Sequence, residues 1–159
     1  MNKPEFNSEV AAMRDSMYRF ARSLLLDSAE AEDVVHDLLE RLWLRRDRLD
    51  GCRSIEAFVM ISVRNACYDR LRRRAAAPKP AQRPQVLVDD ADRRDVRELV
   101  RCAMAQLPAR QREMLHLKDI EGYPTRELAE MYGCDEGSVR MTLTRARRGL
   151  KTVIEEMMR

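Results

Sequence analysis

Residues 125–150, TRELAEMYGCDEGSVRMTLTRARRGL, combine two helical stretches with a glycine between them. Ala129 is small where two helices would cross closely, and Gly133, four residues later, can adopt the left-handed conformation of a tight turn. Val139 follows Ala129 by ten residues and would fill the core from the second helix. Asp135 is a natural N-cap for that helix. The segment therefore predicts a helix-turn-helix.

The exposed face of the second predicted helix is basic. From residue 140 to residue 151 there are five bases and no acid. Guanidinium groups bind phosphates and can contact a guanine edge through two hydrogen bonds, so this face suits the major groove of DNA. A solvated basic helix is the alternative. The face carries Ser138, Arg140, Met141, Thr144, Arg145, Arg147 and Arg148.

The composition predicts an all-α fold for the whole chain. Of 159 residues, 36% are charged and only 5% are aromatic, whereas strands favour β-branched and aromatic side chains. Ser54 is a candidate N-cap after a loop at 49–54. Apolar residues at three-four spacing predict further helices over residues 10–24, 27–43, 55–74, 96–107, 108–117 and 135–157.

An abrupt change in composition divides the chain. Residues 75–84 read AAAPKPAQRP, with three prolines in seven residues, and no apolar period continues through them. Such a segment is typical of a flexible linker. The sequence predicts two small helical domains, 1–74 and 95–159, joined by a linker over 75–94.

The charges are segregated, although the net charge is only +3. Residues 27–40 contain six acids and no base, whereas residues 64–83 contain seven bases and one acid, Asp69. Segregation of this kind indicates separate surfaces for separate partners, which the overall charge conceals.

Several classes of protein are excluded. No apolar run approaches the ~18 residues of a membrane span, and the first ten residues, MNKPEFNSEV, lack a signal-peptide core. The four cysteines form no C-x-x-C pair and there are only two histidines, so we expect reduced thiols, no metal and no cofactor. There is no Gly-rich phosphate loop and no set of nucleophile, base and orienting group, so we expect no enzyme activity. The expected location is the cytoplasm.

These segments together resemble a bacterial RNA polymerase sigma factor of the extracytoplasmic-function (ECF) type, a member of the sigma-70 family that has only regions 2 and 4. Residues 107–150, LPARQREMLHLKDIEGYPTRELAEMYGCDEGSVRMTLTRARRGL, look like region 4. Residues 29–43, AEAEDVVHDLLERLW, and 54–74, SIEAFVMISVRNACYDRLRRR, are similar to two segments of region 2. The resemblance covers nearly the whole chain.

The resemblance implies a polymerase-docking helix within region 2. Asp33, Asp37 and Arg41 match the family's pattern, and His36 stands where glutamine is usual. These four side chains would bind the β′ clamp helices of core RNA polymerase. The acidic character of this helix suits a basic groove on a large partner. An ordinary solvated acidic face is the alternative.

The following helix is implied to capture the melted −10 promoter element. Asn65, Asp69 and Arg72 match an Asn-x3-Asp-x2-Arg pattern, and the loop at 49–54 corresponds to a pocket for a flipped base. Asp69 would orient a neighbouring arginine rather than contact a base. Phe58 would stack on an unpaired base or pack in the core. The implied −10 set is Phe58, Arg64, Asn65, Asp69, Arg72 and Arg73.

Region 4 is implied to read the −35 duplex and to lie near the β flap of polymerase, where Arg110 and Arg112 would contact the DNA backbone or the flap. An anti-sigma factor acting in trans would cover the same faces and inhibit the protein. The chain would thus direct promoter-specific initiation and strand opening. The implied −35 set is Ser138, Arg140, Met141, Thr144, Arg145 and Arg148.

Two other functions compete with this interpretation. A stand-alone helix-turn-helix regulator would account for residues 95–159, but it leaves the acidic helix and the basic helix of the first domain without a purpose. An anti-sigma or adaptor protein that mimics nucleic acid is disfavoured by the basic helices.

Overall fold

The structure, a computed structural model, describes residues 1–76 and 96–159. The chain divides into two compact units, Met1–Ala81 (unit 1) and Gln82–Arg159 (unit 2), each described by itself. Every regular element in the described ranges is helical, which confirms the all-α prediction. In these ranges no helix has the length and apolar character that crossing a membrane requires. From residue 77 onward the predicted linker lies outside the described residues, and the predicted domain boundaries stay a prediction.

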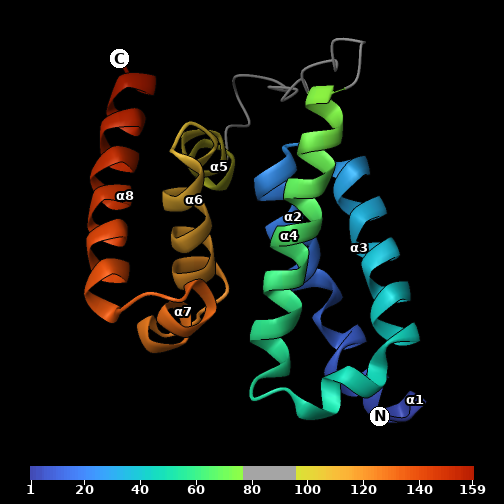
Figure 1. Cartoon of the computed structure of the whole chain (residues 1–159). Coiled ribbons are helices and arrows are strands. Elements are labelled where there is room, and N and C mark those ends of the chain that lie inside the picture. The colour runs from blue at the N-terminus through green and yellow to red at the C-terminus, as the bar shows by residue number, and fades with distance from the viewer. Residues whose placement is uncertain (77–95) are drawn as a thin grey trace. The chain divides into compact units, whose positions relative to one another are not determined.

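Unit 1 is built from three long helices that pack against one another: α2 (Arg14–Leu25), α3 (Ser28–Leu44) and α4 (Ile55–Ala76) (Figure 1). Each helix turns one apolar stripe toward the other two, as the three-four spacing predicts. Burying these stripes is the main stabilising contribution to a unit of this size. The core includes Met17, Phe20, Leu24, Val34, Val35, Leu38, Val59, Met60 and Val63.

The N-terminal segment is broken, so the prediction of one helix over residues 10–24 is wrong at its start. A short helix, α1 (Lys3–Glu9), is followed by a 3-10 turn at Ala11–Met13 before α2 begins. The break allows Phe6 of α1 to reach Trp43 of α3, with ring centroids 5.1 Å apart in an edge-on arrangement. Tertiary contacts of this kind can outweigh a local helical pattern.

Polar side chains cap α3 and α4. Asp27 Oδ1 accepts a hydrogen bond from the backbone N–H of Glu30 at 3.1 Å. The loop predicted over residues 49–54, before α4, overlaps a 3-10 turn at Arg46–Gly51. Ser54 Oγ accepts from the backbone N–H of Ala57 at 3.2 Å, which confirms Ser54 as the N-cap of α4.

Unit 2 contains α5 (Val96–Ala105), α6 (Ala109–Leu115), a π-helical turn η4 (His116–Ile120), α7 (Thr125–Tyr132) and α8 (Glu136–Met157). The long helix α8 contacts α5, α6 and α7. It therefore presents one face to the core along much of its length and leaves the opposite face to solvent. Buried side chains include Ala103, Met104, Leu107, Met114, Leu115, Leu117, Leu128, Val139, Leu143 and Ala146.

The turn between α7 and α8 has the predicted helix-turn-helix chemistry. Gly133 ends α7 in the left-handed conformation, with φ 63°. Asp135 Oδ1 accepts from the backbone N–H of Ser138 at 2.7 Å and so begins α8. Ala129 and Val139 are both buried. The helix-turn-helix prediction is confirmed.

The interior of unit 2 also holds polar contacts that the sequence did not predict. The hydroxyl of Tyr132 donates to Oε1 of the buried Glu113 at 2.9 Å. His116, also buried, has Nε2 2.8 Å from Oε2 of Glu121. Because buried polar groups need partners, the first contact holds α7 against α6, and the second closes the C-terminal end of η4.

Candidate nucleic-acid interface

The outer face of α8 carries the predicted −35 residues. Because Val139, Leu143 and Ala146 turn toward the core, the side chains between them point to solvent. Met141 keeps 57% of its surface exposed. An exposed helix face with three arginines and no acid can contact phosphates and base edges in a groove. All six predicted residues are exposed: Ser138, Arg140, Met141, Thr144, Arg145 and Arg148.

Two further contacts stabilise this face. Arg147 Nη2 lies 2.9 Å from Asp119 Oδ1 and so ties α8 to η4. Asp135 at the start of α8 has its pKa lowered from the ordinary 3.8, chiefly by the hydrogen bond from the backbone of Ser138. The carboxylate form is thus the one that holds the beginning of the helix.

The predicted −10 residues lie along α4. Phe58 has 42% of its surface exposed, so its ring is available for stacking and is not a core side chain. The Arg64 guanidinium lies over the ring of Tyr68, 4.6 Å from its centroid, and Arg64 Nη1 donates to Oδ1 of Asn65 at 3.4 Å. Asp69 pairs with Arg72 one turn along the helix, as expected of an acid that orients a neighbouring arginine.

The predicted docking residues share one face of α3. Asp33, His36, Asp37 and Arg41 follow the three-four spacing that aligns side chains on a helix, and all four are exposed. Val34, Val35 and Leu38 occupy the opposite side in the core. A rigid helix therefore presents the four polar groups outward.

Ion pairs join α3 to α4, and sequence reasoning missed them. Arg70 Nη1 lies 3.0 Å from Asp33 Oδ2, and Arg70 Nη2 lies 3.6 Å from Asp37 Oδ2. A further pair joins Arg74 to Glu30. We call these contacts the α3–α4 ion-pair row. Arg70 and Asp33, for example, lie 37 residues apart, so no local sequence pattern indicates that they pair.

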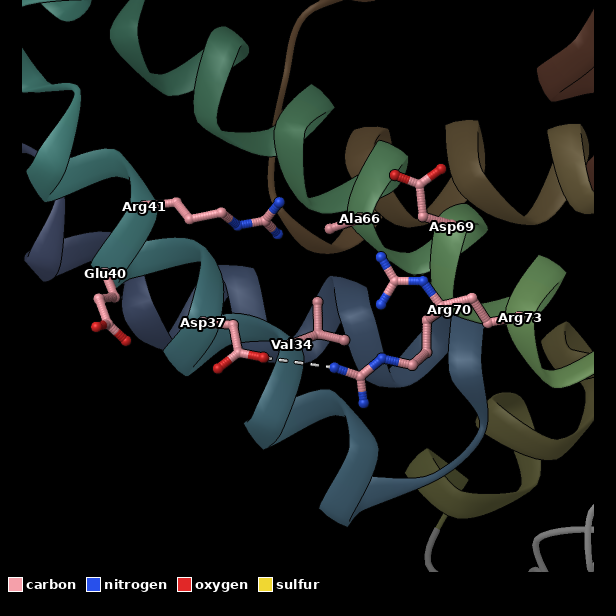
Figure 2. Close-up of a pocket in the computed structure, with 8 residues that line it drawn as sticks. All are labelled: Val34, Asp37, Glu40, Arg41, Ala66, Asp69, Arg70 and Arg73. Atoms are coloured by element: carbon pink, nitrogen blue, oxygen red, sulfur yellow. Dashed lines mark ion pairs between the residues drawn. The ribbon is translucent and has the colours of Figure 1, made fainter.

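A cavity of about 270 Å³ lies beside this row, between the docking helix and the −10 helix. Figure 2 shows Arg41 extending from α3 toward α4, with the Arg70–Asp37 contact at the other side of the cavity. Part of each predicted set therefore lines this cavity: Asp37 and Arg41 from the docking set, and Asp69 and Arg73 from the −10 set. Its lining residues are Val34, Asp37, Glu40, Arg41, Ala66, Asp69, Arg70 and Arg73.

Comparison with known proteins gives family matches in both units. Residues 10–77 match the family described as Sigma-70 region 2, and residues 97–150 match Sigma-70, region 4. The chain is 30% identical over 148 residues to the ECF RNA polymerase sigma factor SigL of Mycobacterium tuberculosis strain H37Rv, covering 89% of this chain and 84% of that protein. It is 31% identical over 155 residues to the RNA polymerase sigma-E factor of Streptomyces avermitilis, covering 95% and 86%.

Two solved structures share the fold. The sigma factor RpoE from Bartonella quintana, crystallised with the anti-sigma factor NepR, superimposes with a TM-score of 0.75 at 24% identity over 95% of this chain and 97% of that one. CnrH in complex with the cytosolic domain of CnrY gives 0.72 at 21% identity, covering 98% and 90%.

Taken with the helix-turn-helix and the basic α4, these matches define the class as a two-part promoter-recognition protein. The chain belongs to the sigma-70 family as a sigma factor of the ECF type. Its function is that of a promoter-directing sigma factor, as the sequence predicts.

Proposed function

We propose a division of labour among three exposed helix faces. The α3 face with Asp33, His36, Asp37 and Arg41 binds the β′ clamp helices of core RNA polymerase. The support is that all four side chains are exposed on one face of a helix whose other side is anchored in the core. Electrostatic complementarity with a basic groove would speed and orient this association.

The α4 face captures the melted −10 strand. Phe58, 42% exposed, stacks on an unpaired base. Asn65, also exposed, offers an amide to a base edge. Arg72 and Arg73 contact the strand's phosphates, with Asp69 holding Arg72 in place.

The α8 face reads the −35 duplex from the major groove, with unit 2 near the β flap of polymerase. This assignment is supported by the exposure of the six predicted side chains. Arg140 and Arg145 supply contacts to bases and phosphates. Polymerase supplies the chemistry, and this chain supplies the choice of promoter.

An anti-sigma factor acting in trans regulates the protein by covering these faces. The support is the similarity to RpoE, whose crystallised partner is an anti-sigma factor. The exposed acidic and basic faces of unit 1 would provide its binding surface.

The test is promoter binding and opening by the assembled polymerase. Arg140→Ala combined with Arg145→Ala should lose −35 protection, because each lost base contact lowers the affinity for the promoter by about tenfold. A control that also removes two positive charges, Arg101→Ala with Arg159→Ala, both exposed and outside the basic run of α8, should keep it. Asn65→Ala should impair strand opening more than duplex binding. Unchanged −35 protection in the first variant, or equal losses of opening and duplex binding in the last, would contradict these assignments.

A further inference from the structure

Arg70 sits between the two acidic side chains of the docking face. Its Nη1 contacts Asp33 Oδ2 at 3.0 Å and its Nη2 contacts Asp37 Oδ2 at 3.6 Å. The arginine side chain is only 24% exposed, whereas the two carboxylates are 62% and 52% exposed. The guanidinium therefore lies beneath the carboxylates, and one planar group spans both of them.

We propose that Arg70 is a positioning residue for polymerase docking. Its guanidinium holds Asp33 and Asp37 in one fixed arrangement, which basic groups on polymerase then recognise. This inference rests on the proposed docking role of α3. Both carboxylates remain more than half exposed while they are paired with Arg70, so they stay accessible to a partner.

Two opposing effects determine how much the loss of Arg70 should change the affinity for polymerase. Without Arg70, two exposed aspartates one helical turn apart would each have to be ordered when polymerase binds, which weakens binding by about tenfold in total. Against this, the positive charge of Arg70 repels a basic partner. At ~6 Å in water this repulsion is worth only about threefold in affinity. Positioning is therefore the larger effect, and a variant that keeps the charge isolates it.

Arg70→Lys is that variant, because lysine keeps the positive charge but offers a single ammonium group in place of a planar fork. We expect its affinity for core RNA polymerase to fall about tenfold. The matched control is Arg74→Lys. Arg74 makes the same kind of contact from α4 to α3, but its partner Glu30 lies outside the docking set. This control should bind polymerase like the wild type.

A cycle of variants separates positioning from a structural role. In the background Asp33→Asn with Asp37→Asn, the carboxylates are absent, so Arg70→Lys should cause no further loss of affinity. The stability of unit 1 is followed in parallel through the fluorescence of Trp43 in α3. A loss of polymerase affinity that disappears in the Asn background, while the fluorescence of Trp43 shows unit 1 fully folded under the binding conditions, supports the proposal.

Two results overturn the inference. One is wild-type affinity in Arg70→Lys, and the other is an equal loss from Arg70→Lys with and without the carboxylates. Failure of the docking role itself looks different, because the unaltered chain would then not bind core polymerase at all.

Discussion

Replacing Tyr132 by phenylalanine removes one hydroxyl from the interior of unit 2 and leaves the ring in place. That hydroxyl donates to Oε1 of Glu113, whose surface is only 1% exposed, at 2.9 Å. The ring contact with Arg110, whose guanidinium carbon lies 4.9 Å from the ring centroid, does not depend on the hydroxyl. The change therefore isolates one hydrogen bond between α7 and α6.

The expected cost follows from the kind of bond. A hydrogen bond to a carboxylate contributes about 2 kcal/mol, because the buried acceptor loses a partner that water does not replace. In a domain of this size that corresponds to a fall in Tm of roughly 8–16 °C. The loss should appear in unit 2, since both residues lie there.

The two units can be followed separately in a urea titration of the full chain. The protein has one tryptophan, Trp43, which belongs to unit 1, so fluorescence reports that unit. Far-UV circular dichroism reports the helices of both units. Tyr132→Phe should shift a part of the dichroism transition to lower urea and leave the fluorescence midpoint unchanged.

A double-mutant cycle that combines Tyr132→Phe with Glu113→Gln tests whether Glu113 is the residue to which the hydroxyl donates. Unchanged unfolding of Tyr132→Phe, or strictly additive effects of the two substitutions, would refute the reasoning.

Three further predictions concern single positions. Burial raises the pKa of the Cys67 thiol to about 12. Iodoacetamide at neutral pH should therefore leave Cys67 unmodified in the folded chain while the other three cysteines react. Mass spectrometry that finds Cys67 labelled as fast as the others would contradict this. Asp135 has a lowered pKa, chiefly through the hydrogen bond from the Ser138 backbone, so its contribution to stability is present above the ordinary value of 3.8 and is lost as pH falls below it. The stability of unit 2 should therefore fall as the pH drops through 3.8 and below it, and Asp135→Asn should reduce that fall. An identical pH profile would exclude the role. Gly133 has φ 63° and open space around its Cα, so Gly133→Ala should destabilise unit 2 by about 1 kcal/mol through backbone strain alone, with Gly133→Asn costing less; equal stability of the alanine variant would contradict it.

The helix-turn-helix could be predicted because its determinants are local. A left-handed glycine at 133, an N-cap at 135 and apolar side chains at fixed spacing each depend on neighbours within a few residues. For the same reason the exposure of the α8 and α3 faces follows from the three-four pattern, which assigns one side of a helix to the core.

The contacts between helices could not be predicted in this way. Periodicity tells which face of a helix is buried but not which residue of another helix meets it. Arg70 and Asp33 lie 37 residues apart, and Tyr132 and Glu113 lie 19 apart. The Phe6–Trp43 contact, beside the break before α2, likewise joins residues far apart in the sequence.

The proposed binding of α3 to polymerase can be measured by titrating labelled core RNA polymerase with this chain, an Asp37→Arg variant and a Glu32→Arg variant. Glu32 is exposed on the same helix and undergoes the same change of charge, but it lies outside the docking set. We expect tight one-to-one binding by the wild type and by Glu32→Arg, with binding lost in Asp37→Arg. Equal binding by all three would remove the docking assignment. If the wild type does not bind polymerase even at low salt, the chain does not act as a polymerase subunit, and a DNA-binding regulator remains.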